Sequence, residues 1–407
     1  MSLFVFRDLY AHGWFCSLLS LDDALGYQLP KEAKAAYAEL FSQLLNAEKT
    51  SLAQALAHTL LSSENPLNKP KTPSPALQQA ALYDLGYLQK LAKKDYQNLA
   101  QECIDENLPP LAGLPNKFDI MQDRLESFSQ TLLTATPKDI LEKLISSYRH
   151  YGSGFFAEYS ALSFNEGQLN PIKRPVDIDM SRLIGLEKEL KRLKDNTEAF
   201  LAGQKAHHAL LYGMRGSGKS TAVRSLLPLY QDRGLKIIEL HPQELKRLPE
   251  LSEKLHEKPF YSIIFVDDLA FEQNDTSYQP LKTLLEGSLS SQPEKMLVYA
   301  TSNRRHLIKE NFKDRPDPLD DDVHKWDSHN EKLALSDRFG LSITFPNANQ
   351  SRYLSIVQGL LEYEGIKLNL DQDDSLRLEA IRFAEWGNGY SGRTAQQFIN
   401  QLKNRLA

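Results

Sequence analysis

The sequence predicts an α/β domain with a parallel sheet flanked by helices, preceded by an α-helical N-terminal domain and followed by a small helical unit. Three observations support this prediction. Short apolar runs alternate with helical patterns over residues 209–345, a glycine-rich loop follows the first of these runs, and the flanking regions space apolar residues three and four apart. Strands that are apolar along their whole length are typical of parallel sheets covered on both faces.

Composition excludes several classes of protein. The 407 residues exceed what one hydrophobic core usually supports, so two or three domains are expected. The 48 Lys and Arg against 53 Asp and Glu argue against a protein built wholly to coat nucleic acid or an anionic membrane. No apolar run of roughly 18 residues predicts a membrane span. With no signal-peptide pattern, and with Cys16 and Cys103 in no C-x-x-C motif, we expect a cytoplasmic protein.

Residues 1–165 are expected to form the helical N-terminal domain. The prolines within residues 65–75 predict a surface loop, because each lacks an amide donor. No catalytic constellation occurs in this domain, so we expect it to recognise a protein partner that the sequence does not specify. Apolar spacing predicts helices at 34–45, 52–61, 76–93 and 138–148.

A linker at 170–175 is expected to lead into the α/β domain, residues 175–347, which opens with a helix at 186–201. After Pro346 the pattern is helical only, which predicts a third domain, a lid, at 348–407. Its predicted helices are 353–363, 375–386 and 393–406. The predicted strands are 209–212, 235–240, 261–266, 296–300 and 341–345.

Residues 213–220 match the pattern G-x-x-x-x-G-K-[ST], between a predicted strand and a predicted helix. Glycines let successive amides turn toward phosphate oxygens, and the helix adds its positive N-terminal end. Lys219 would neutralise the β- and γ-phosphates and Ser220 would ligate Mg²⁺. We therefore interpret the segment as a binding loop for ATP and Mg²⁺ and not as a plain glycine-rich turn. The predicted phosphate-binding residues are Gly213, Arg215, Gly216, Ser217, Gly218, Lys219, Ser220 and Thr221.

Two aspartates follow the predicted strand 261–266. We expect Asp267 to hold Mg²⁺ through water and Asp268 to orient the attacking water. Alone, such a pair is more often a turn or a helix cap, but the phosphate loop favours the catalytic interpretation. The second position is more often Glu, and Asp reaches one methylene less far, so Glu272 is the reserve candidate.

The order of three further residues along the chain makes them candidates for the nucleotide site. Asn303 follows a predicted strand, where it would hydrogen-bond the water or the γ-phosphate. Arg338 precedes the last strand and Arg393 opens the last helix. Without that order, each would be interpreted as a turn residue or a solvated arginine.

This series of motifs resembles the AAA+ ATPases over residues 175–407. More closely, it resembles a bacterial AAA+ family catalogued as a domain of unknown function, with helicase loaders and transposition helper ATPases as more distant relatives. The segments that carry the closer resemblance are 183–185, 196–203, 210–220, 267–272, 331–340 and 391–393.

The resemblance implies roles for single residues. Asn303 matches sensor 1, and Arg393 matches sensor 2, which acts on the nucleotide of its own subunit. Arg338 matches the arginine finger that reaches a neighbouring subunit, which implies a homo-oligomer. Ile184 and Gly185 match the segment near adenine. Asp268 departs from the Glu usual in AAA+ proteins, a departure that the closer family shares.

Two charged stretches are weaker candidates. Residues 304–315 are locally basic and would suit a nucleic-acid backbone, but with almost no interleaved aromatic residues a solvated loop is favoured. No calcium-loop spacing supports a metal site at the acidic cluster that follows. This cluster consists of Asp317, Asp320, Asp321 and Asp322.

These patterns predict a Mg²⁺-dependent ATPase that drives or times the remodelling of an unknown partner. The short Asp268 leaves open a nucleotide-gated binding module with negligible turnover, and the basic stretch leaves open a DNA-remodelling loader. A small-molecule kinase would need neither Arg338 nor Arg393.

Overall fold

The structure is a computed structural model, and it divides the chain into two compact units, Met1–Tyr159 and Ser160–Ala407. Each unit has its own hydrophobic core. Among the described residues, no helix is long and apolar enough to cross a membrane. The structure describes residues 2–47, 51–69, 72–111, 113, 122–256, 258–271, 275, 277–286, 295–305, 307 and 335–406.

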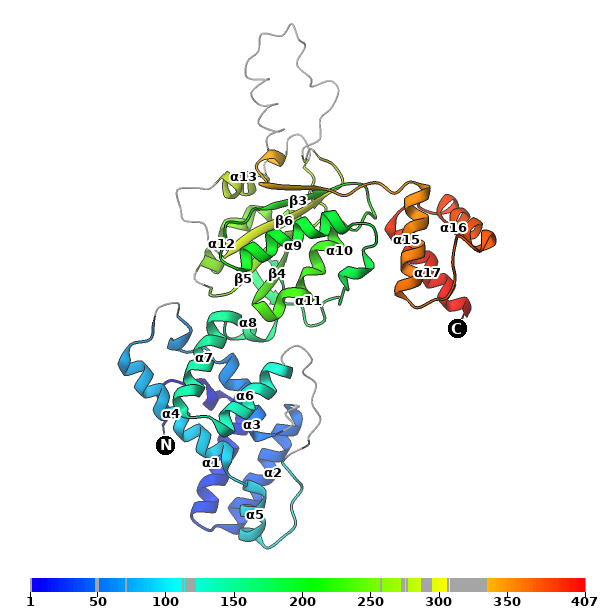
Figure 1. The fold of residues 1–407 in the computed structure, drawn as a ribbon. Coiled ribbons are helices and arrows are strands. Elements are labelled where there is room, and N and C mark those ends of the chain that lie inside the picture. The colour runs from blue at the N-terminus through cyan, green and yellow to red at the C-terminus, as the bar shows by residue number, and fades with distance from the viewer. Residues whose placement is uncertain are drawn as a thin grey trace. The chain divides into compact units, whose positions relative to one another are not determined.

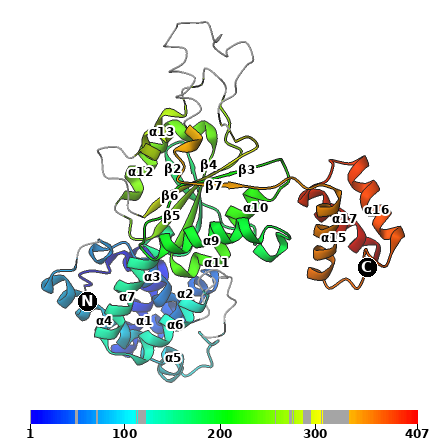
Figure 2. The same ribbon diagram turned by 45° about the horizontal axis from the view of Figure 1, so that its top comes forward.

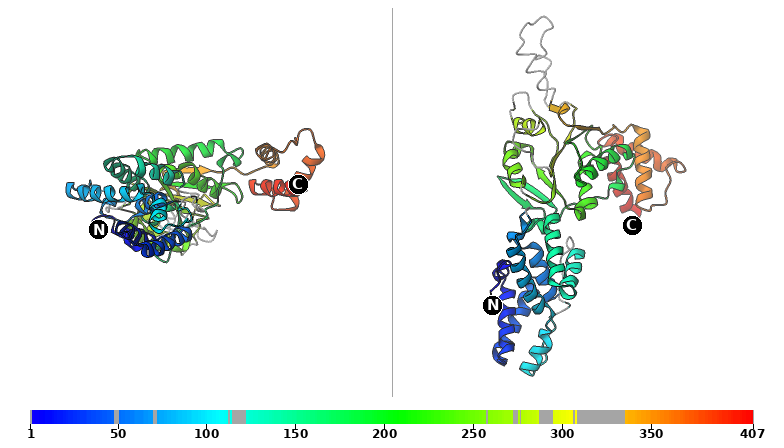
Figure 3. Two further views of the ribbon diagram at one scale, coloured as in Figure 1. Left: turned by 90° about the horizontal axis from the view of Figure 1, so that it is seen from below. Right: turned by 60° about the vertical axis from the view of Figure 1, so that its left-hand side comes forward.

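The N-terminal unit is a bundle of helices that run alongside one another (Figure 3). The four helices expected from the sequence are confirmed and lie within α2, α3, α4 and α7. Prolines start α2, α4 and α7, where the missing amide costs nothing, and Thr136 with Asp139 forms a capping box on α7. The elements are η1 (Arg7–Ala11), α1 (Gly13–Gly26), α2 (Pro30–Asn46), α3 (Leu52–Ser62), η2 (Pro66–Asn68), α4 (Pro75–Lys93), α5 (Tyr96–Ile104), α6 (Gln122–Thr134), α7 (Pro137–Tyr151) and α8 (Phe155–Glu158).

The second unit contains a seven-stranded sheet in the order β2-β1-β4-β5-β6-β3-β7. The expected parallel sheet is confirmed: every pairing is parallel except that of β1 with β2, an antiparallel hairpin at one edge. The strands are β1 (Ala161–Asn165), β2 (Gln168–Pro171), β3 (Ala209–Tyr212), β4 (Leu235–Leu240), β5 (Tyr261–Val266), β6 (Met296–Ser302) and β7 (Leu341–Thr344).

The hairpin moves the start of the α/β unit to an earlier residue than we expected. β1 pairs with β4, so the segment 160–171 belongs to the sheet and not to a helical domain with a linker at 170–175. Leu162 and Phe164 are fully buried there. β2 is only four residues long and half exposed, so its pattern carries too little periodicity to reveal a strand.

Helices cover both faces of the sheet, as the sequence predicts. In Figure 2 the strands run between α9, α10 and α11 on one side and α12 and α13 on the other. Buried residues of α9, α10 and α11 join the core beneath β3 and β5. The elements are η3 (Met180–Arg182), α9 (Glu187–Leu201), α10 (Lys219–Arg224), α11 (Leu226–Tyr230), η4 (Gln231–Arg233), η5 (Pro242–Arg247), α12 (Leu248–His256) and α13 (Gln279–Glu286).

The predicted helical lid consists of α15 (Gln350–Tyr363), α16 (Asp374–Trp386) and α17 (Gly392–Leu406), which gather around a core of their own (Figure 1). Asn349 and Asp373 cap the first two of these helices by accepting a backbone N–H. The fold is therefore a mainly parallel α/β core with a small helical lid, after a helical N-terminal unit.

Candidate functional site

The phosphate loop follows β3 and its glycines are required by close approach and by backbone angle. Gly213 has φ 153°, and a Cβ there would lie 2.3 Å from the carbonyl oxygen of Phe345. Gly218 has φ 96° at the start of α10, and a Cβ there would meet Leu183 at 3.0 Å. Any larger residue would push the loop off the sheet, so the fold fixes where the loop amides lie.

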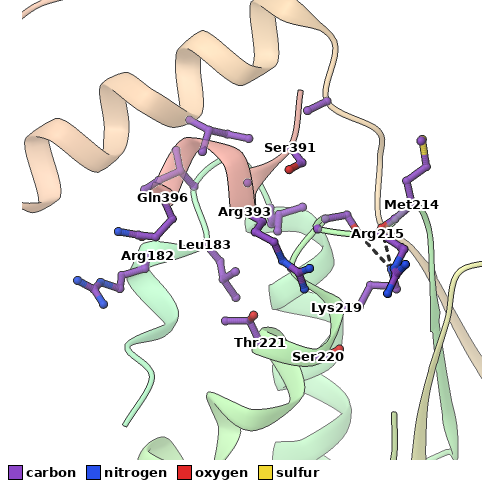
Figure 4. Close-up of a pocket in the computed structure, with 18 of the residues that line it drawn as sticks. Arg182, Leu183, Met214, Arg215, Lys219, Ser220, Thr221, Ser391, Arg393 and Gln396 are labelled. Carbon is purple, nitrogen blue, oxygen red and sulfur yellow. Dashed lines mark hydrogen bonds between the residues drawn. The ribbon is translucent and has the colours of Figure 1, made fainter. Parts of the chain in front are cut away.

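Lys219 lies at the centre of this loop, and its side chain is buried. Its Nζ donates to the carbonyl oxygens of Gly213 and Met214, each at 2.8 Å (Figure 4). Burial lowers the pKa of Lys219, while the nearby carboxylates of Asp268 and Asp267 act in the opposite direction. The loop thus holds a preorganised cation beside its own amides.

Asp267, directly after β5, joins two hydroxyl groups. Ser220 Oγ donates to Asp267 Oδ1 at 2.5 Å, and Thr301 Oγ1 donates to the same atom at 2.6 Å. Hydroxyl and carboxylate oxygens are hard donors that suit Mg²⁺, so Ser220 and Asp267 fit the ion predicted from the sequence. Within the described residues, no group of three or more His, Cys, Asp or Glu side chains is arranged to hold a metal.

Asn303 connects Asp268 to Lys219. Its Nδ2 donates to Asp268 Oδ1 at 2.5 Å, and its Oδ1 accepts from Lys219 Nζ at 3.3 Å. Asp268 has the left-handed φ of 54°, and its backbone N–H donates to Thr301 Oγ1 at 2.9 Å. Asn303 and Asp268, which we expect to act on the γ-phosphate and on water, are therefore hydrogen-bonded to each other.

The first turn of α17 approaches the phosphate loop from the lid. The backbone N–H of Arg393 donates to the carbonyl oxygen of Gly216 at 3.3 Å. A Cβ on Gly216 would lie 3.0 Å from Ser391 Oγ, so only glycine permits this approach. Figure 4 shows the Arg393 side chain reaching from the start of α17 toward Lys219. A lid cation and a core cation therefore face the same space.

The segment around Ile184 and Gly185 lies against the lid. Arg352 of α15 donates to the carbonyl oxygen of Gly185, and a Cβ on Gly359 would lie 2.6 Å from Ile184 Cγ2. Arg182 Nη2 lies 2.5 Å from Glu364 Oε1. These contacts join the expected adenine segment to the lid.

Glu364 pairs with a second cation of the lid. Lys403 Nζ lies 2.6 Å from Glu364 Oε2. The hydrogen bond from Lys403, followed by the one from Arg182, lowers the pKa of Glu364, so this carboxylate is charged at neutral pH.

Most of these groups border one cavity of about 920 Å³, a size that accommodates a nucleotide. Of the residues predicted from the sequence, Gly185 and Gly213 shape its wall without lining it. Arg215 lines the cavity with an exposed side chain. The predicted residues that line it are Ile184, Arg215, Gly216, Ser217, Gly218, Lys219, Ser220, Thr221, Asp267, Asp268, Asn303 and Arg393.

Arg338 lies elsewhere in the described part of the chain. It forms an ion pair with Glu286 of α13, and its buried Nε has no hydrogen-bond partner among the residues that the structure describes. It does not line the cavity, so its role as a finger stays a prediction. Glu272, the acidic cluster at 317–322 and most of the basic stretch 304–315 lie outside the described residues.

Three further residues of the site, Thr301, Arg224 and Glu239, are not predicted from the sequence. Thr301 lies within β6 and bonds to both aspartates. Arg224 donates to Asp267 and Glu239. Its distance of four residues from Ser220, one helical turn, was the available signal.

The model of a family described as "Protein of unknown function (DUF815)" matches residues 157–406. No curated protein matches the chain.

Similar solved structures include the RuvB Holliday junction branch migration motor of Thermotoga maritima, at 14% identity and a TM-score of 0.37. This match covers 56% of the present chain and 64% of RuvB. The Orc1 protein of Aeropyrum pernix, solved in complex with DNA, is 16% identical with a TM-score of 0.37, over 55% of this chain and 61% of Orc1. The matched region spans less than two thirds of either protein.

Proposed function

Because the chain belongs to the DUF815 family and has the AAA+ P-loop fold, which binds nucleotides, we propose that its cavity binds ATP with Mg²⁺ and hydrolyses it. Hydrolysis would drive or time the remodelling of a partner protein. One observation carries this proposal. Lys219, the Ser220–Asp267 pair, the Asp268–Asn303 pair and Arg393 converge on a single cavity.

In this proposal the residues of the cavity act on the phosphates of ATP, on the bound ion and on the attacking water. The loop amides and Lys219 receive the β- and γ-phosphates, and Arg393 adds positive charge from the lid. Mg²⁺, when bound, supplies Lewis-acid polarisation of the phosphate oxygens. Ser220 and Asp267 would hold it, because their oxygens already lie 2.5 Å apart.

Asp268 would orient the attacking water, and Asn303 would place it. The Asn303 amide donates to Asp268 in this structure, and a γ-phosphate oxygen would offer the same amide a second acceptor. Occupation of the site would then bring phosphate, amide and carboxylate into one hydrogen-bonded group.

Lys219→Ala tests the nucleotide site. The variant should lose at least about tenfold in ATP affinity by calorimetry, because a buried cation facing the phosphates is removed. Lys188→Ala is the matched control, since it removes an exposed cation of α9 that does not line the cavity, and Figure 4 shows Lys219 beside Thr221 and Ser220 of the loop. Equal affinity in the wild type and the Lys219 variant would contradict the assignment.

A binding module with negligible turnover is the second candidate, and the Asn303–Asp268 hydrogen bond favours it. Asp268 Oδ1 already accepts a hydrogen bond from the Asn303 amide, and the Asp side chain is one methylene shorter than Glu. This carboxylate therefore reaches an attacking water less readily. Steady-state turnover at saturating ATP separates the two functions.

We also propose that the protein acts as a homo-oligomer through Arg338, and that the N-terminal unit selects the partner. Arg338→Ala should bind ATP and hydrolyse it slowly. Mixing this variant with Lys219→Ala should recover part of the activity, because some interfaces then pair an intact loop with an intact arginine. Full turnover by a strictly monomeric protein would exclude a role in trans.

A further inference from the structure

Arg224, the last residue of α10, also lines the cavity. Its guanidinium joins two carboxylates: Nε donates to Glu239 Oε1 at 3.0 Å, and Nη2 donates to Asp267 Oδ2 at 3.1 Å. The spacing of four residues places Arg224 on the same side of α10 as Ser220. One helix thus presents a hydroxyl and a cation to the same aspartate.

The sheet brings the two carboxylates together. Glu239 of β4 pairs in register with Phe265 of β5, and Asp267 lies two residues beyond Phe265, on the same face. The Arg224 guanidinium lies 5.2 Å from the centre of the Phe265 ring. Two hydrogen bonds and an aromatic face therefore fix this side chain.

The two oxygens of Asp267 consequently have different partners. Oδ1 accepts the hydroxyls of Ser220 and Thr301, whereas Oδ2 accepts from Arg224. A carboxylate bonded to a guanidinium attracts a second cation less strongly. Glu239 offsets part of the charge of Arg224, so the positive guanidinium lies between the negative carboxylates of Glu239 and Asp267.

We propose that Arg224 and Glu239 tune the Mg²⁺ affinity of the ATP site in opposite directions. Arg224 is a positioning residue that orients Asp267 and weakens its attraction for the ion, and Glu239 counteracts Arg224. The inference rests on the proposed function, because it concerns the metal bound with ATP.

The test compares the dissociation constant of a fluorescent ATP analogue in EDTA with that in saturating Mg²⁺, for the full chain. The constant in EDTA divided by the constant in Mg²⁺ measures how much the metal strengthens binding of the analogue. Side chains about one-third exposed are partly screened by water, so the ratio should rise about three- to tenfold in Arg224→Gln and fall about three- to tenfold in Glu239→Gln. Arg224→Lys keeps the charge and should largely restore the wild-type ratio. Arg192→Gln, which removes an exposed cation of α9, is the matched control.

Opposite shifts support the inference, since a purely structural role would move both variants in the same direction. Shifts in the same direction, or no shift in Glu239→Gln, overturn it, and the second outcome decides even where Arg224→Gln fails to fold. A wild-type chain that binds no analogue overturns the proposed function and this inference with it. Binding by the wild type without opposed shifts overturns this inference alone.

Discussion

Two buried or half-buried aspartates, one in each unit, show how differently the two parts of the chain use a carboxylate. Asp84 in the N-terminal unit is fully buried and accepts the backbone N–H groups of Phe4, Val5 and Phe6. Asp267 in the second unit is 36% exposed and shares its oxygens with side chains at the edge of a cavity. The carboxylate of Asp84 serves only to hold the backbone, whereas that of Asp267 lies where a ligand in the cavity can reach it.

The largest expected effect concerns where the second unit begins. A fragment starting at residue 160 should fold and bind ATP, whereas one starting at 172 should aggregate, because it lacks β1 and β2 and exposes the edge of β4. Circular dichroism and light scattering of the two fragments provide the measurement. A soluble, ATP-binding fragment from 172 would show that the hairpin is dispensable and that the sequence-based boundary was adequate.

That boundary illustrates what the sequence could and could not predict. The strands β3 to β7 were predicted because they are short runs rich in apolar residues between helical patterns, and the phosphate loop because its residues are contiguous. The hairpin was missed because β2 alternates over only four residues.

Residues that meet only through tertiary structure were also missed. Glu239 of β4 and Asp267 after β5 come together through the pairing of these two strands, which no local pattern reveals, and Arg224 of α10 donates to both carboxylates. Arg352 contacts Gly185 across 167 positions of sequence. Only the ordered series of motifs indicated that Arg393 would come near the phosphate loop.

A smaller effect is expected from Asp84→Asn. Loss of the charge on three backbone hydrogen bonds should lower the free energy of unfolding of the N-terminal unit by about 1–3 kcal/mol. ATP affinity should be unchanged, because the cavity belongs to the other unit. Denaturant titration measures the first quantity and calorimetry the second.

Asp23→Asn, at an exposed position of α1, is the control and should leave both quantities unchanged. Unaltered stability in Asp84→Asn would mean that this carboxylate is not a structural anchor, and the contrast with Asp267 would lose its basis.

The central claim is that the cavity hydrolyses ATP through a water oriented by Asp268. The most direct measurement is phosphate release at saturating ATP by the wild type and by Asp268→Asn, with ATP binding measured on the same samples. Asn keeps the size and the hydrogen-bonding reach of Asp but lacks its charge, so we expect binding to be retained and turnover to fall by about 10²-fold or more. Equal turnover in the two proteins, or no turnover in a wild type that binds ATP and Mg²⁺, would contradict the account.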